Sequence, residues 1–309
     1  MAGPANRGLF SRLLAPGLRK VFFDNYNLWP EEYSTIFNVE SSTRAYEEEL
    51  MIAGLGLFEE KGEGKSLVWD SGKEGPTQRY NHVSFSLGFR ITREMHDDDL
   101  YSVMQKLAKE LGQSARLTVE YKAAELLDDI FIGDKYRSAD GKPICATDHQ
   151  LIIGGEYANR SAVPSDLGIG SLRAASERLE RTPNERGLPE NRGRGKNVVI
   201  TPTYQWIAKE IIGTELKPYT SDNTTNAFNE MGLNYTVNHY ILNDDLWLLT
   251  ADKAQHDLKF FWRTKPEFNN DDDFDTGDAK FKGFMRFSLG ATDWRGVDGG
   301  SADTNVMPI

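Results

Sequence analysis

The longest regular pattern of apolar positions covers residues 97–131. There, apolar side chains recur at steps of three and four residues, the spacing of one face of an α-helix. Acidic residues 97–99 precede the pattern and Gly133 follows it, as is usual at the two ends of a helix. At 1.5 Å per residue, the pattern predicts a helix roughly 50 Å long, with Gly112 as a candidate bend.

Residues 79–91 alternate apolar and polar side chains with the two-residue period of a half-buried strand. A shorter strand is expected at 65–70, and Gly-rich turn sequences surround it. We therefore expect a long hairpin over residues 53–91. A two-stranded ribbon of this length is marginal by itself, so it needs a partner surface.

Residues 151–250 mix helix and strand patterns, which indicates a compact α+β unit. Residues 183–196 are rich in Gly, Pro and Arg and are expected to form a loop. The predicted elements are helices at 166–181 and 203–214, a strand from residue 197, and two strands that flank the turn at 243–245.

The two ends of the chain show no single period. Residues 1–52 carry scattered aromatic side chains, so we expect an extended arm that docks on another surface, closed by a short helix at 47–57. The residues after Arg295 are polar and Gly-rich, which is typical of a flexible tail.

Composition narrows the class of protein. The net charge of −11 is the opposite of what a sequence-independent nucleic-acid binder needs. The single cysteine, Cys145, excludes an intrachain disulfide and a multi-cysteine zinc site. The sequence contains no apolar run of about 18 residues, so no membrane span is expected.

A second predicted hairpin joins residues 258–264 to 280–290 and carries an acidic run at 269–281. Asp271, Asp273 and Asp275 match the first positions of a calcium loop. Thr276 stands where that loop needs Gly, and Lys282 stands where it needs Glu. We therefore expect a solvated loop and no metal site.

Other chemical motifs fail in the same way. The run "GEGKS" at 62–66 has Glu59 where a phosphate loop requires Gly. Cys145 and His149 could form a nucleophile–base pair, but no recognisable signature surrounds them. The sequence thus predicts no catalytic residue, no cofactor and no metal ligand.

An arm, an overhanging hairpin, one very long helix and an α+β unit suit a subunit of a closed assembly. Several runs, among them "WPEEYSTIFNVESSTRAYEEEL" at 29–50 and "CATDHQLIIGG" at 145–155, resemble the major capsid proteins of tailed bacteriophages. Their fold is shared with encapsulins and with the floor of herpesvirus capsids. The resemblance covers roughly residues 20–296, and its other runs are 55–66, 87–120, 237–250 and 260–296.

The resemblance implies an α+β capsid fold with an arm, an extended loop, a spine helix beside a peripheral sheet, and an axial domain. The implied parts are an arm at 1–52, an extended β-hairpin loop at 53–91, a peripheral domain with the spine helix at 92–150, an axial domain at 151–250, returning peripheral strands at 251–296 and a flexible tail at 297–309.

The resemblance also implies partners. The chain would assemble with itself as pentamers and hexamers into an icosahedral virion shell, in the host cytoplasm, around double-stranded DNA bound without sequence specificity. A separate scaffold protein and a portal are expected, because few residues precede the matched region. Decoration proteins and the lysine cross-linking of some relatives are left open, although Lys61, Lys65 and Lys73 lie in the extended loop.

We expect contacts between subunits at exposed aromatic and charged side chains, because aromatics dominate interface energetics. Each aromatic also has a local core role as its alternative. The acidic run would be solvated or face a basic patch of the next subunit, such as Arg192, Arg194 or Arg90. The candidates are Phe22, Trp29, Lys65, Trp69, Arg79, Tyr80, Arg192, Arg194, Asp271, Asp272 and Asp273.

Two alternatives remain at this point. One is an encapsulin-like compartment that holds a cargo enzyme. The other is a metal-dependent soluble enzyme that uses the cluster from Asp271 to Asp278.

Overall fold

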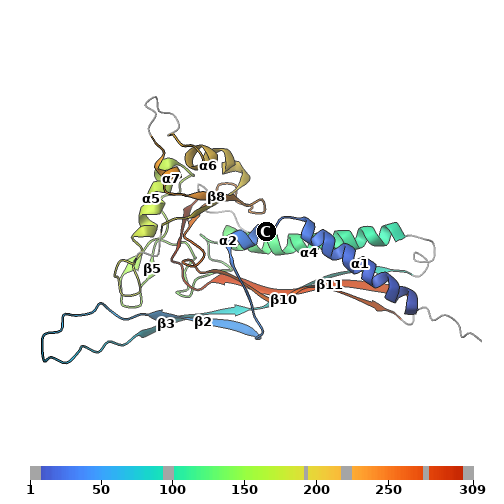
Figure 1. Ribbon diagram of the computed structural model, residues 1–309, viewed down its shortest axis with the longest axis horizontal. Coiled ribbons are helices and arrows are strands. Elements are labelled where there is room, and N and C mark those ends of the chain that lie inside the picture. The colour runs from blue at the N-terminus through green and yellow to red at the C-terminus, as the bar shows by residue number, and fades with distance from the viewer. Residues whose placement is uncertain (1–7, 93–100, 191–193, 217–224, 274–277, 302–309) are drawn as a thin grey trace, which may run out of the picture.

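The computed structural model describes residues 8–92, 101–190, 194–216, 225–273 and 278–301. One half of the molecule is an elongated layer in which two helices lie along a four-stranded sheet (Figure 1). A second unit of helices and strands stands above one end of this layer, and a narrow two-stranded ribbon projects from beneath it. The overall α+β class is as expected from the sequence.

The predicted long helix is confirmed as α4, Tyr101–Asp128. Gly112 serves close packing: a Cβ there would lie 2.4 Å from the carbonyl oxygen of Phe22. Phe22 belongs to helix α1, Gly8–Leu28, which packs along α4. The expectation of an extended arm is therefore wrong for this segment. The buried side chains of Leu18, Phe22 and Tyr26 recur every four residues, a helical face that Pro16 and Gly17 obscure in the sequence.

The chain then forms a short helix, α2 (Tyr33–Ile36), and enters the peripheral sheet as β1 (Asn38–Ser41). The order of this sheet is β1-β10-β11-β4. The predicted second hairpin is confirmed as the antiparallel pair β10 (Leu258–Asp272) and β11 (Ala279–Ala291). Its alternating apolar side chains are buried, among them Phe260, Trp262, Met285 and Phe287.

The ribbon pairs β2 (Tyr46–Ala53) with β3 (Lys73–Asn81), and it corrects three expectations. Residues 47–57 form no helix, and 65–70 form no strand. The predicted strand at 79–91 breaks at His82, and β4 (Val83–Ile91) crosses to the peripheral sheet, where it pairs with β11. The apolar alternation starts only at Val83, and Asn81 is polar where the same phase would need an apolar residue, so the change of phase in the sequence falls at this break.

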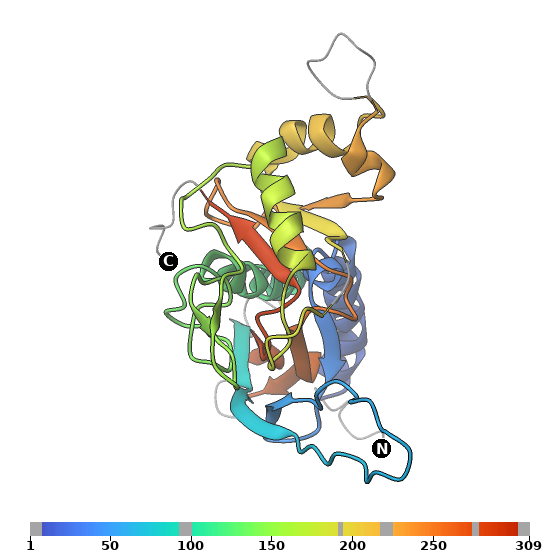
Figure 2. The ribbon, with the colours of Figure 1, turned by 90° about the vertical axis from the view of Figure 1, so that its left-hand side faces the viewer.

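The second unit, which we call the axial unit, covers most of the axial domain expected at 151–250 and adds β12 from the end of the described chain. It is built on the sheet β12-β9-β7-β8, with helices packed around it (Figure 2). The helices predicted at 166–181 and 203–214 are confirmed as α5 and α6. A two-stranded pair, β5 with β6, lies nearby. The bounds are β5 His149–Gln150, β6 Glu156–Tyr157, α5 Ile169–Glu180, β7 Asn197–Ile200, 3-10 helix Pro202–Tyr204, α6 Gln205–Ile212, α7 Ala227–Glu230, β8 Asn234–Val237, β9 Trp247–Thr250 and β12 Val297–Gly300.

Strand β12 corrects the expectation of a flexible tail from residue 297. All four of its residues are buried. A Cβ at Gly299 would lie 2.6 Å from the carbonyl oxygen of Trp247, and one at Gly300 would lie 3.0 Å from the indole ring. The glycines that resemble a tail in the sequence are the residues that let this strand approach β9.

One hydrophobic core joins the two halves of the molecule. Leu126 and Leu127 of α4 share it with Phe260 of the peripheral sheet and with Val199 and Leu248 of the axial sheet. The axial unit is thus packed onto the end of α4. Within the described ranges, no helix has both the length and the apolarity to cross a membrane.

Candidate subunit-assembly surfaces

The loop between β2 and β3 exposes apolar side chains that the described part of the chain leaves uncovered. Leu57 and Val68 are largely exposed, Trp69 is 87% exposed, and Phe58 is fully exposed. Several large apolar side chains exposed on one loop indicate a binding surface. From here on, the name extended loop is kept for residues 54–72, the part of the predicted loop 53–91 that lies between β2 and β3.

The base of the extended loop is clamped by Arg186, from the region 183–196 that was expected to form a loop. Its guanidinium forms an ion pair with Asp70 at 2.9 Å and donates to the carbonyl oxygens of Gly54 at 2.6 Å and Ser71 at 3.0 Å. The amide of Gly56 donates to Asp70 at 2.7 Å. This amide, together with Arg186, lowers the pKa of the Asp70 carboxyl. The clamp fixes both strands where they leave the ribbon.

A buried hydrogen-bond network holds the other end of the ribbon. Ser42 precedes β2 and His82 follows β3, and the His82 Nε2 lies 3.1 Å from the Ser42 hydroxyl. His82 Nδ1 lies 2.9 Å from the hydroxyl of Ser288 on β11. Ser42 in turn donates to Glu47 at 2.6 Å. Burial and the neighbouring Arg286 lower the pKa of His82, which favours the neutral ring that this network can satisfy.

Helix α4 holds other segments through buried carboxylates. Glu120 accepts from the amides of Glu32 at 3.2 Å and Tyr33 at 3.0 Å, the start of α2. Burial raises the pKa of Glu120 to about 7, although these amides oppose the shift. Asp128 accepts from the amides of Leu242 and Asn243, in the axial unit. Burial raises its pKa as well. Two buried carboxylates of α4 thus bind the start of α2 and a segment of the axial unit.

Two predicted contact residues lie in the core of the chain itself. Phe22 has no exposed surface and packs 5.3 Å from Phe268 between their ring centroids. Tyr80 is 2% exposed, and its hydroxyl lies 2.6 Å from that of Thr292. The local core role, which was the alternative for every aromatic, therefore applies to both. Burial raises the pKa of the Tyr80 phenol well above its usual value.

Four other candidates are exposed. Trp29 is 39% exposed at the end of α1, and Lys65 and Trp69 lie on the extended loop. The Arg79 guanidinium covers the ring of Tyr46 at 3.7 Å. These residues remain predicted contacts.

Among the described residues, the remaining basic candidates do not gather into one basic surface patch. Arg194 is exposed and lies 3.5 Å from Glu180 of α5. Arg192 lies outside the described residues. Arg90, expected as a partner for the acidic run of a neighbour, forms an ion pair with Asp278 of its own chain at 3.1 Å.

The acidic run lies at the end of the β10–β11 hairpin. Asp271 and Asp272 are the last residues of β10, and Asp271 stands opposite Lys280. The carboxylate of Asp273 pairs with Lys280 at 2.6 Å. Residues 274–277 lie outside the described part of the chain. Among the described residues, no group of acidic, histidine or cysteine side chains has the arrangement of a metal site.

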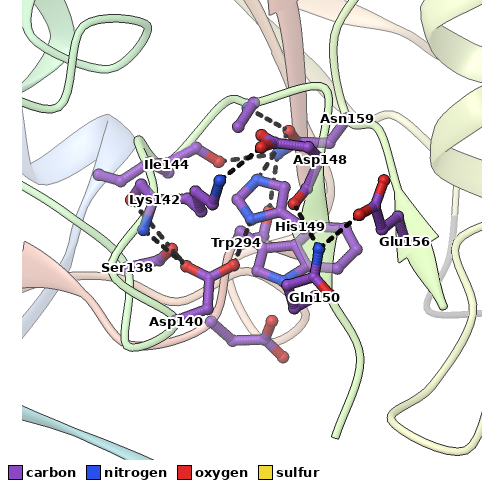
Figure 3. A network of polar contacts seen from close by, with 12 residues as sticks. Ser138, Asp140, Lys142, Ile144, Asp148, His149, Gln150, Glu156, Asn159 and Trp294 are labelled. Carbon is purple, nitrogen blue, oxygen red and sulfur yellow. Dashed lines mark hydrogen bonds and ion pairs between the residues drawn. The ribbon is translucent and has the colours of Figure 1, made fainter. Parts of the chain in front are cut away.

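Cys145 and His149 have structural roles, and Figure 3 shows the polar network around His149. Burial raises the pKa of the Cys145 thiol well above its usual value, so the thiol stays protonated. His149 lies 2.6 Å from Asp140 and 3.1 Å from the Asn159 carbonyl, and its ring stacks on Trp294 at 4.3 Å. The Asn159 amide donates to three carbonyl oxygens, including that of Trp294. The network ties residues 138–159 to the end of the chain.

The family comparison decides the class of protein. Residues 75–297, more than two thirds of the chain, match the family described as phage capsid protein. The chain belongs to this family. It is therefore a structural protein of a phage shell, a component of the virion capsid, and the resemblance noted in the sequence is confirmed. No curated protein matches the chain.

Solved structures support the capsid fold. The virus-like particle of Pyrococcus furiosus matches with a TM-score of 0.56 at 12% identity, over 92% of this chain and 98% of that one. The capsid of cyanophage P-SCSP1u matches with a TM-score of 0.56 at 11% identity, over 86% of each chain. The procapsid of bacteriophage JBD30 matches with a TM-score of 0.54 at 16% identity, over 97% of this capsid protein and 77% of that chain.

Sequence reasoning missed the residues that hold the extended loop in place. Arg186 and Ser42 stand in segments with no regular pattern, His82 lies within the predicted strand 79–91, and the partners of all three are distant in sequence. The available signal was weak: a single arginine within a loop and a single histidine within a strand.

Proposed function

We propose that this capsid protein is the major subunit of an icosahedral phage head that encloses double-stranded DNA. The observation that carries the proposal is the extended loop, whose exposed Leu57, Phe58 and Trp69 need a partner surface. Its base is rigidly held by Arg186, so the loop is presented in one direction. A closed shell repeats such a contact many times, which makes a modest contact sufficient.

The parts of the chain support different roles in this assembly. Helix α4 and the peripheral sheet provide a rigid plate, and we assign the axial unit to the contacts around the five- and six-fold axes. The extended loop and the exposed Trp29 reach neighbouring subunits. A separate scaffold protein, a portal and assembly in the host cytoplasm belong to the same proposal, as does the absence of any enzymatic role.

Electron microscopy of the purified chain, alone and with its scaffold protein, tests the proposal. Uniform hollow shells are expected from the wild type. Trp69→Ser and Phe58→Ser should abolish them while circular dichroism and thermal unfolding stay unchanged, because neither side chain packs in the folded subunit. A chain that stays monomeric with scaffold present contradicts the proposal.

The similarity to a virus-like particle favours one second candidate, a compartment that stores cargo protein instead of DNA. Shells purified from infected cells distinguish the two. Nuclease-protected double-stranded DNA supports the phage head, and a stoichiometric co-purifying enzyme supports the compartment. Shells that protect DNA without any cargo exclude the second candidate.

A further inference from the structure

A cationic groove lies beside the point where the ribbon meets the peripheral sheet. It has a volume of about 430 Å³. We call its apolar and aromatic lining the floor (Val83, Phe85, Tyr136, Phe287 and Leu289) and its basic lining the rim (Arg79, Lys122, Lys135 and Arg137). We call this site the cationic groove.

The rim carries more positive than negative charge. Lys122 and Lys135 both pair with one carboxylate, that of Glu125, at 2.7 Å each. The Arg137 guanidinium donates to the carbonyl oxygen of Gly133. Within the described part of the chain, no ion pair joins Arg137 to a carboxylate. In a protein with a net charge of −11, this rim is an exception that fits an acidic partner.

One wall of the groove is the end of β11 that lies beyond its pairing with β4. Strand β4 pairs with β11 only as far as the register Val83–Phe287. Beyond it, residues 288–290 of β11 line the groove, and among the described residues they pair with β10 alone. Leu289 is half-buried there, while Ser288 and Gly290 are buried, so this wall offers apolar side-chain contact to an occupant of the groove.

We infer that the cationic groove binds residues 57–60 of the extended loop of a second copy of this chain. The sequence there is Leu-Phe-Glu-Glu, and its two apolar side chains are exposed. In an extended strand, alternate residues share a face, so each face presents one apolar residue and then a glutamate. This order fits an apolar floor followed by a basic rim.

The contact cannot form within one chain. The groove is lined by residues 78–83 at one end of the ribbon, and the extended loop leaves the other end. Strand β3 alone separates the two ends by roughly 25 Å, at about 3.3 Å per residue. Figure 1 shows the loop projecting away from the peripheral sheet. The clamp by Arg186 keeps it there, so the occupant must come from another subunit.

The inference rests on the proposed function, and it names the acceptor for the loop. Charge reversal tests it. Lys135→Glu with Arg137→Glu should lower the yield of shells by roughly tenfold or more, since like charges then face each other. Glu59→Lys with Glu60→Lys should do the same. The chain that carries all four changes should assemble again. Lys109→Glu with Glu63→Lys, which changes exposed positions outside the site, should assemble as the wild type does.

A cross-link provides a direct measurement. Cys145 is buried and is the only cysteine, so introduced pairs report without interference. Glu60→Cys with Arg137→Cys should form intersubunit disulfides in assembled shells, and Glu60→Cys with Lys109→Cys should not. If the wild type forms shells, but the four changes do not restore assembly and this disulfide does not form, the inference is overturned while the proposed function stands. Failure of the wild type to assemble overturns the proposed function instead.

Discussion

The guanidinium of Arg186 and the carboxylate of Asp70 stand 116 residues apart in the chain and 2.9 Å apart in space. The pair joins the extended loop to a loop of the axial half of the molecule. It converts a long, two-stranded ribbon into a projection with a fixed direction. Assembly of a shell needs such a direction, because every copy must present its loop at the same angle.

Removal of this clamp should free the extended loop without unfolding the chain. In Arg186→Ala, proteolysis within residues 54–72 should accelerate at least about fivefold, while the thermal midpoint changes by no more than a few degrees, since the pair is partly solvent-exposed. Limited proteolysis with mass spectrometry measures the effect. Arg173→Ala, which breaks the exposed pair with Glu177 on α5, is the matched control and should leave the loop protected. Equal cleavage rates in both variants would contradict the role of the clamp.

Gly112→Ala should destabilise the subunit, although alanine favours helix. The substitution improves helix propensity by up to about 1 kcal/mol. The new Cβ would lie 2.4 Å from the carbonyl oxygen of Phe22, which forces α1 away from α4. We expect a net loss of about 2 kcal/mol in the free energy of unfolding, measured with urea.

The control for this prediction is Gly170→Ala in α5, where a Cβ meets no atom within 4 Å. That variant should be as stable as the wild type or more so. A Gly112→Ala variant that gains stability would show that α1 does not need its close approach to α4.

Ionisation of Glu120 should weaken the subunit as the pH rises. Burial raises its pKa from 4.5 to about 7, so its contribution to stability is complete below pH 4.5 and is lost as the pH rises through 7. Glu120→Gln cannot ionise. Between pH 5 and pH 8, the variant should gain about 2–3 kcal/mol relative to the wild type, from about 1.4 kcal/mol per unit of pKa shift. Urea unfolding at both pH values measures this difference.

Glu110→Gln is the control for Glu120, since Glu110 is exposed on the same helix. Its stability should follow the wild type at both pH values. Parallel pH profiles for Glu120→Gln and the wild type would mean that the carboxylate at the start of α2 is not desolvated as the structure indicates.

His256 should weaken the subunit in acid. Burial lowers its pKa from 6.5 to about 4, so its contribution is complete above pH 6.5 and is lost as the pH falls toward 4. From pH 7 to pH 5, the wild type should lose about 2 kcal/mol more than His256→Gln does. Chemical unfolding at the two pH values measures the loss. His239→Gln, at an exposed position, should not show the difference.

Local patterns in the sequence determined the elements that bury one regular face. The long helix α4, the hairpin β10–β11 and helices α5 and α6 were all predicted, because burial of one side imposes a period that neighbouring residues alone reveal. The family-specific runs added the capsid fold and the shell function. The direction of the extended loop could not be predicted from the sequence, because Arg186 and Asp70 lie 116 residues apart and no local pattern links them.

Tertiary structure decided the features that depend on contacts between distant segments. Phe22 looked like an anchor for a neighbouring subunit, but Gly112 opens a place for it against α4. The glycines of Val297–Gly300 suggested a flexible tail. In the structure this segment is a buried strand, and its glycines let it pack closely against Trp247. In each case the residue's role depends on burial against another segment. That segment is in place only in the folded protein, so local sequence propensity cannot predict the role.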